Sequence, residues 1–159
     1  MRVALVVDNP YRDLPGLVLV AVRLCQQGIT CYLVPMNLQW RELAALAPDF
    51  VLLNYLRTVN QDLAWQLMNA GIKVGVLDTE GGIFSSIEEE YVPNLASEQT
   101  IRYAVSCFCS WGTKLAEYVI EKGWYRRDQV VVTGSPRFDF YVHPWREVAL
   151  KTSIYAQEY

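Results

Sequence analysis

Two carboxylates lie close together where a predicted buried strand ends. Asp78 and Glu80 follow the apolar run Lys73–Leu77 and precede the glycines Gly81 and Gly82. A carboxylate at such a position could act as general base on a sugar hydroxyl, and the glycines would let backbone amides come close to a ligand. The same spacing also fits a simple turn in which Asp78 caps a helix and Glu80 faces solvent.

Polar residues also follow the first and the last predicted strand. These segments are Asp8–Asp13 and Thr133–Asp139. In open parallel sheets ligands bind beyond the carboxyl ends of the strands, so both segments are candidate ligand positions. In the second segment Gly134 and Pro136 define a turn, and Arg137 could pair with Asp139 or anchor an adjoining segment. That pattern favours a structural role.

Several function classes lack support. No G-x-G-x-x-G or Walker loop is present, and Asp8 would repel a pyrophosphate. The sequence therefore argues against NAD and ATP as ligands by the usual routes, and no cofactor is predicted.

His143 is the single histidine, and the sequence has no nucleophile motif, so neither a catalytic triad nor a metal site is expected. The net charge of −3 argues against nucleic acid as a partner. All four cysteines are interpreted as small buried hydrophobes of a reducing compartment.

Short continuous apolar runs alternate with longer amphipathic segments. Strands are predicted over residues 3–7, 30–34, 50–53, 73–77, 104–109 and 129–132. Helices are predicted over 38–46, 60–69 and 113–122, and a first helix over about 14 residues between Asp13, a possible N-cap, and Gly28. This alternation predicts an α/β fold, a Rossmann-like three-layer α/β/α sandwich with a mostly parallel sheet of about six strands. Residues 79–102 do not follow the alternation of strands and helices and are predicted to form a long loop. A loop of this length inside a compact domain favours a functional role.

The sequence contains no signal-peptide core after Met1 and no apolar run long enough to span a membrane. A cytoplasmic protein is therefore expected, with peripheral attachment to the inner membrane as a further possibility.

Four motifs together resemble bacterial surface-carbohydrate biosynthesis proteins of the GT-B glycosyltransferase type. They are Asn9–Gly16, Asp78–Gly81, Phe108–Gly112 and Val132–Asp139. The last motif resembles a Thr-Gly-Asn-Pro-type turn that closes the N-terminal domain in this group and in GT-B-like nucleotide-sugar 2-epimerases. Ser135 stands where Asn is more usual, and Thr79 stands where a second acid is common.

The resemblance implies a GT-B N-terminal domain-like fold and two domains that face each other across a cleft. Residues 1–142 would form the acceptor-side domain, and residues 143–159 a linker and helix toward a donor-binding domain that the 159 residues do not include. The expected partners are a sugar or lipid-linked glycan acceptor and, through the second domain, a nucleotide-sugar donor. The isolated chain is expected to be inactive, and dimerisation is plausible because the surface for the second domain is exposed.

The resemblance also assigns roles by position. Glu80 is the candidate catalytic carboxylate that activates or positions the acceptor, and Asp78 would orient it. The remaining assignments place substrate-binding residues on the two lips of the cleft and three residues at the domain junction: Asn9, Tyr11, Arg12, Asp13, Gly81 and Gly82 for substrate, and Ser135, Arg137 and Asp139 for the junction.

Two other functions fit the same sequence. The chain could be a standalone flavodoxin-like module that binds a small ligand or a protein without catalysis. It could also be half of an enzyme similar to the nucleotide-sugar 2-epimerases, a reading that rests on the shared turn after the last strand.

Overall fold

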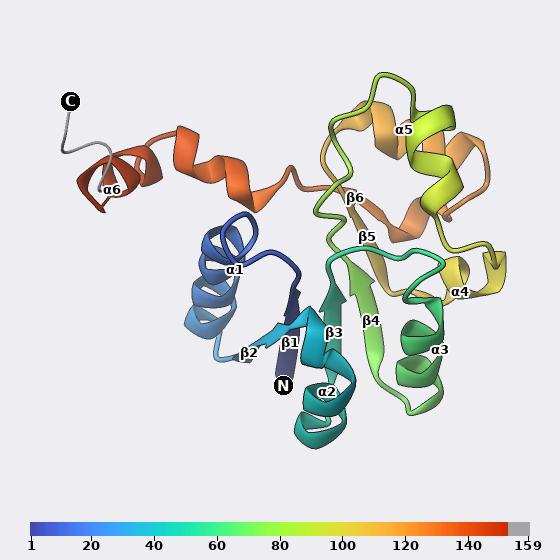
Figure 1. Ribbon diagram of the computed structural model, residues 1–159, viewed down its shortest axis with the longest axis horizontal. Coiled ribbons are helices and arrows are strands. Elements are labelled where there is room, and N and C mark those ends of the chain that lie inside the picture. Colours follow the sequence, from blue (N-terminus) through green and yellow to red (C-terminus); the bar gives the residue numbers. More distant parts are fainter. Residues whose placement is uncertain (153–159) are drawn as a thin grey trace.

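A single sheet of six strands forms the centre of the structure, a computed structural model that describes residues 1–152. The strands are β1 (Arg2–Val7), β2 (Thr30–Pro35), β3 (Phe50–Leu53), β4 (Lys73–Val76), β5 (Cys107–Ser110) and β6 (Val130–Val132). They pair in the order β2-β1-β3-β4-β5-β6, and every pair is parallel. The predicted Rossmann-like α/β fold with a six-stranded parallel sheet is confirmed (Figure 1).

Helices connect most of the strands, as the alternating pattern predicts. They are α1 (Leu14–Gln26), α2 (Gln39–Leu46), α3 (Gln61–Asn69), α4 (Gln99–Ala104), α5 (Thr113–Glu121) and α6 (Trp145–Thr152). Pro15 lies in the first turn of α1, where its missing N–H leaves no helical bond unmade. Gly28 follows the end of α1 with φ at 76°, a backbone conformation that glycine adopts without strain.

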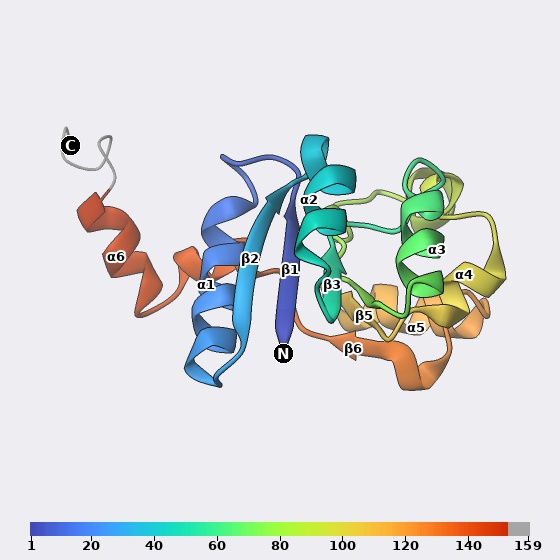
Figure 2. The ribbon, with the colours of Figure 1, turned by 90° about the horizontal axis from the view of Figure 1, so that it is seen from below.

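The two faces of the sheet are covered unequally. The connection from β1 to β2 runs one way along the sheet and the later connections run the other way, so right-handed crossovers place α1 on one face and α2, α3 and α5 on the other. The smaller core, around Leu5 and Leu17, lies under α1. The larger core includes Leu43, Leu63 and Val119 from the other three helices. Figure 2 shows α1 on one side of β1 and β2, and α2 and α3 on the other.

The segment between β4 and β5 differs from the prediction. It contains a π-helical turn (Ile87–Tyr91), a 3-10 turn (Val92–Asn94) and α4, so it is not a continuous loop. The predicted strand 104–109 begins too early, because Ala104 is the last residue of α4 and the strand starts at Cys107. The buried side chain of Arg102 ties α4 to the segments on either side of it, since its guanidinium donates hydrogen bonds to the carbonyls of Ala96 and Trp124.

The helices are all too short or too polar to cross a membrane, as far as the described residues extend. Cys25 is exposed, and the other three cysteines are only partly buried, so the interpretation that all four are buried is wrong.

The segment after β6 returns to α1. The 3-10 helix Pro136–Tyr141 packs on the first turn of α1, and α6 lies farther from the sheet (Figure 1). The contact depends on Gly16, because a Cβ there would lie 2.7 Å from the backbone nitrogen of Arg137 and 2.8 Å from the carbonyl carbon of Pro136. Backbone atoms cannot move aside as a flexible side chain can, so the close approach requires glycine.

We expect Gly16→Ala to lower the free energy of unfolding by about 1–3 kcal/mol, the usual cost of overpacking. In an unobstructed helix the same change would stabilise by about 1 kcal/mol, so the sign is diagnostic. Gly112→Ala is the matched control, because its Cβ meets no atom within 4 Å. Urea unfolding monitored by circular dichroism measures both variants. A Gly16→Ala variant as stable as the parent would contradict the close packing of α1 on residues 136–137.

Candidate functional site

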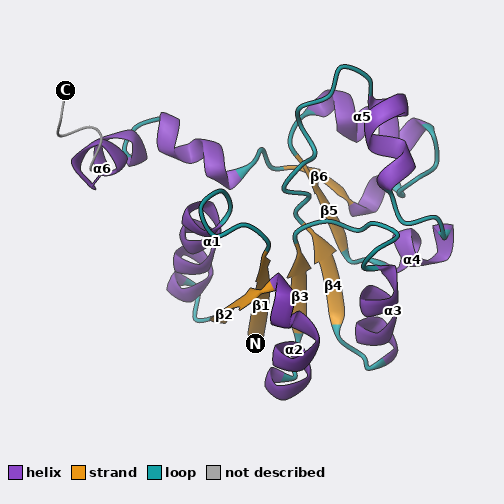
Figure 3. Ribbon diagram, in the orientation of Figure 1, coloured by secondary structure: helices purple, strands orange, loops and turns teal. Residues whose placement is uncertain are grey.

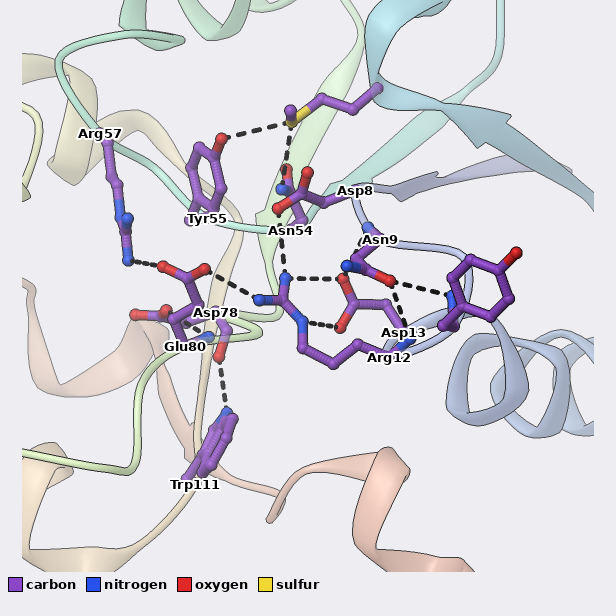
Figure 4. Close-up of polar contacts among 12 residues, drawn as sticks. Asp8, Asn9, Arg12, Asp13, Asn54, Tyr55, Arg57, Asp78, Glu80 and Trp111 are labelled. Carbon is purple, nitrogen blue, oxygen red and sulfur yellow. Dashed lines mark hydrogen bonds and ion pairs between the residues drawn. The ribbon is translucent and has the colours of Figure 1, made fainter. Parts of the chain in front are cut away.

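Three loops meet where the order of the strands reverses. Strand β1 lies between β2 and β3, so the chain leaves it in opposite directions along the sheet, and such a switch point is where open α/β sheets form a ligand crevice. The loops that follow β1, β3 and β4 supply the polar side chains there (Figures 3 and 4). The segments Asp8–Asp13 and Asp78–Gly82, which the resemblance places on the two lips of a cleft, are in direct contact through Arg12 and Glu80.

Arg12 lies at the centre of this polar cluster. Its guanidinium binds Asp13 through two hydrogen bonds, Nε to Oδ1 at 2.7 Å and Nη2 to Oδ2 at 2.8 Å. It also reaches Asp8 at 3.2 Å and the Oε1 atom of Glu80 at 3.0 Å. The hydrogen bond with Asp13 contributes most to raising the pKa of Arg12 above its ordinary value, so the side chain is a permanent cation.

The loop after β1 is folded by its own side chains. The Oδ1 atom of Asn9 accepts hydrogen bonds from the backbone N–H groups of Tyr11 and Arg12, at 2.9 and 3.1 Å. Asp13 precedes α1 but does not cap it with its side chain. Its carboxylate is buried and accepts instead from Arg12 and from the N–H of Asn9. Tyr11 is 95% exposed and lies outside the cluster. Asn9 and Asp13 therefore position Arg12, and Arg12 faces the crevice.

Glu80 joins the loops after β1 and β3. Its Oε1 atom accepts from Arg12, and its Oε2 atom lies 2.6 Å from Nη2 of Arg57 (Figure 4). Burial by itself would raise the pKa of Glu80, but the charges and hydrogen bonds of Arg57 and Arg12 outweigh burial and lower it. Glu80 is therefore ionised. Each carboxylate oxygen can accept a second hydrogen bond, so Glu80 keeps acceptor capacity for a ligand.

Asp78 lies behind Glu80, out of reach of solvent. Its side chain is buried and accepts a hydrogen bond from the hydroxyl of Tyr91, and the N–H of Glu80 donates to its Oδ1 atom at 3.4 Å. Burial raises the pKa of Asp78 to about 6, although the hydrogen bond from Tyr91 opposes that rise. The backbone of Asp78 is left-handed, with φ at 50°, and turns the chain toward the crevice. Asp78 can thus act only through Glu80 and the turn.

The two glycines after Glu80 leave room for neighbouring side chains, Gly82 for the ring of Trp111 and Gly81 for the carboxyl group of Asp78. A Cβ on Gly82 would lie 1.7 Å from the Cε3 atom of Trp111, and a Cβ on Gly81 would lie 3.0 Å from the Asp78 carboxyl carbon. Neither glycine has positive φ. The indole N–H of Trp111 donates to the carbonyl of Asp78 at 2.6 Å, so ring and turn hold each other in place.

The segment after β6 reaches the same region. Arg137 lines a pocket of about 390 Å³ together with Arg12, Arg57 and Glu80. Its guanidinium carbon lies 4.5 Å from the centre of the Trp111 ring. Ser135 and Asp139 line an adjoining pocket of about 510 Å³ with Gly81 and Gly82. Within residues 1–152, Arg137 and Asp139 form no ion pair.

Some site residues were not predicted from the sequence. Arg57 and Tyr55 follow β3, and the guanidinium of Arg57 lies 4.6 Å from the centre of the Tyr55 ring. Asn54, next to them, is buried. The signal was available, because Asn54–Arg57 is a fourth polar segment at a strand end and belongs to the strand next to β1. No group of three metal-ligating side chains occurs in the described part of the chain.

Several solved structures have a fold similar to that of this chain. A UDP-GlcNAc 2-epimerase from Methanocaldococcus jannaschii matches 99% of this chain and 52% of its own length, with a TM-score of 0.69 and 10% identity. The UDP-GlcNAc 2-epimerase from Neisseria meningitidis bound to UDP-GlcNAc matches 95% and 53%, with a TM-score of 0.63 and 12% identity. The Staphylococcus aureus MnaA–UDP structure matches 89% and 46%, with a TM-score of 0.63 and 14% identity.

These likenesses show the fold alone. The chain spans about half the length of the solved structures it matches. No protein-family model matches the sequence, and no curated protein matches it. The Rossmann-like fold of this chain is therefore the one that about half of each of these 2-epimerase structures has.

The buried carboxyl of Asp78 predicts a pH dependence of stability. Its pKa is about 6 in the folded state against 3.8 for an unperturbed Asp, so the folded chain binds this proton more tightly. The stability from this group is complete below about pH 4 and falls as pH rises to about 6, by about 2–3 kcal/mol. Asp78→Asn should remove this fall and keep the turn, because Asn tolerates positive φ.

Urea unfolding at pH 4 to 7 measures the effect, as the difference in unfolding free energy between the parent chain and Asp78→Asn. Asp128→Asn, at an exposed position, is the control. Parallel pH profiles for the parent and Asp78→Asn would contradict the assignment of a buried proton to Asp78.

Proposed function

We propose that this chain is the sugar-binding half of a two-domain, GT-B-like enzyme that acts on a nucleotide sugar. The observation that carries the proposal is the cluster of Arg12, Glu80 and Arg57 at the switch point of a fold shared with UDP-GlcNAc 2-epimerases. A ligand crevice is expected at that place in an open parallel sheet. The donors and acceptors gathered there match the hydroxyl groups of a sugar.

The charges of the cluster support a sugar as the ligand of this part of the site. Asp8, Asp13 and Glu80 face only two guanidiniums, those of Arg12 and Arg57. The cluster therefore offers fixed hydrogen-bonding groups and little positive charge left to attract the diphosphate of a nucleotide. The nucleotide would then bind mainly to a second domain across the cleft, as the sequence resemblance implies.

Glu80 would position the sugar through hydrogen bonds. Ion pairs with two arginines lower its pKa, which makes it a weaker base than an ordinary glutamate. Its remaining lone pairs can accept from hydroxyl groups, and bonds to a charged acceptor are about twice as strong as neutral ones. Of the two roles inferred for Glu80, acceptor positioning is the one that this geometry supports.

Two reaction classes fit this architecture. Epimerisation of a nucleotide sugar is favoured by the solved structures, which are 2-epimerases. Transfer of a sugar to a surface-glycan acceptor rests on the motifs Asp78–Gly81 and Val132–Asp139. Both reactions need the same sugar-binding half, so the proposal for this chain is common to them.

We expect Glu80→Gln to weaken sugar binding by about tenfold, because the neutral amide loses one charged acceptor and releases two arginines. Titration of the 159-residue chain with N-acetylglucosamine, followed by 15N-resolved NMR, gives the dissociation constant. Glu121→Gln removes a similar charge at an exposed position on α5 and should bind like the parent chain. A parent chain that binds no sugar would refute the proposed function, whereas equal binding by Glu80→Gln would remove Glu80 from the site.

We also expect no turnover by the 159-residue chain alone. Proton NMR of UDP-GlcNAc incubated with the chain should show neither a new anomeric signal nor free UDP over a day. The reason is that the site described here offers no nucleotide-binding loop. Steady formation of a 2-epimer or of free UDP would contradict the need for a second domain, and it would also decide between epimerisation and transfer.

A further inference from the structure

Arg137 is a cation without a carboxylate partner. Among the described residues no acidic oxygen lies within ion-pair distance of its guanidinium. The guanidinium lies over the rings of Trp111 and Phe138, at 4.5 and 4.9 Å, and its Nε atom is buried without a hydrogen bond. The side chain as a whole is half-buried, and its unpaired Nε group gains a partner when an anion binds beside it.

Thr79 contributes a second unsatisfied group to the same place. Its side chain is only 5% exposed, and its hydroxyl has no hydrogen-bond partner. Thr79 and Arg137 both line the 390 Å³ pocket that also contains Glu80. A buried hydroxyl without a partner costs stability, and that cost is offset when a ligand supplies the bond.

The other charges of the pocket are already compensated. Glu80 is shared between Arg12 and Arg57. The carboxylate of Glu90 accepts from the backbone N–H groups of Ser85 and Ser86, at 3.1 and 3.3 Å. Arg12 also binds Asp8 and Asp13, so Arg137 is the one guanidinium of the lining that has no carboxylate partner among the described residues.

We propose that Arg137 and Thr79 form an oxyanion subsite beside Glu80, so that the ligand is an acidic sugar derivative that carries a carboxylate or a phosphate. The inference rests on the proposed sugar-binding function and adds the charge of the ligand to it. Glu80 and its two arginines hold the hydroxyl groups, and the fork of the Arg137 guanidinium takes two oxygens of the acidic group. The Thr79 hydroxyl donates to the same oxyanion.

The subsite is held in shape before any ligand arrives. The indole of Trp111 is fixed by its hydrogen bond to the carbonyl of Asp78 and by the space left at Gly82. The guanidinium rests on that ring, so its orientation follows from the turn that also presents Glu80. Groups fixed in this way lose little conformational entropy on binding.

The test compares ligands that differ only in the acidic group. Isothermal titration of the 159-residue chain with glucuronate and with glucose isolates a carboxylate. N-acetylglucosamine 1-phosphate and N-acetylglucosamine isolate a phosphate. We expect at least one acidic probe to bind about tenfold or more tightly than its neutral match, and the larger ratio identifies the natural anion. Neutral sugars that bind as well as both acidic probes overturn the inference and leave the proposed function intact.

Three variants at two positions separate binding from folding. Arg137→Gln should remove the advantage of the acidic probe, and Arg137→Lys should restore only part of it, because Lys lacks the planar fork. Thr79→Val should weaken the acidic probe severalfold while leaving thermal stability equal or higher, because it replaces an unsatisfied hydroxyl with a methyl group.

Arg23→Gln on α1 is the matched control for charge and should bind like the parent chain, because Arg23 is exposed and its guanidinium bonds Gln26. If Arg137→Gln does not fold, Thr79→Val alone decides, and an unchanged preference for the acidic probe in that variant then overturns the subsite as a whole. Unchanged preference for the acidic probe in a folded Thr79→Val variant overturns the role of Thr79, and unchanged preference in Arg137→Gln overturns the subsite.

Discussion

The carboxylate of Glu80 ties together loops that come from three different strands. Arg12 follows β1, Arg57 follows β3, and Glu80 itself follows β4. These loops meet because parallel strands present their carboxyl ends at one edge and because the strand order reverses beside β1. One charged group thus fixes the relative positions of the segments that form the crevice. The remaining contacts, from Asn9 and Asp13 to Asp78, support the members of this bridge.

The ring of Trp111 supports the turn that carries Glu80. Trp111 packs over Gly82, donates to the carbonyl of Asp78 and supports the guanidinium of Arg137. The turn Asp78–Gly82 therefore positions both Glu80 and, through Trp111, Arg137. The flat ring of Trp111 and the planar guanidinium of Arg137 restrict each other's orientation. Tyr11, by contrast, is exposed to solvent and has no such packing.

Local sequence patterns predicted the sheet and part of the site. Apolar runs of the right length marked the strands, and Asp78 with Glu80 marked an important turn. The burial of Asp78 could not be predicted, because it depends on Tyr91 and Trp111, which come from later parts of the chain. Arg57, which pairs with Glu80, was missed for a similar reason. It follows β3, and β3 lies next to β1 only because of the strand order. Ala104 was misassigned because an apolar run does not distinguish a helix end from a strand start.

The left-handed backbone at Asp78 restricts how this position can change during evolution. Glycine, asparagine and aspartate adopt positive φ at low cost, and larger or branched side chains do not. Of these three, glycine would leave the hydroxyl of Tyr91 without an acceptor, whereas asparagine would keep both the turn and that bond. Natural variants at this position should therefore alternate between Asp and Asn, and an Asn lineage would keep the architecture of the crevice after losing its buried ionisable group.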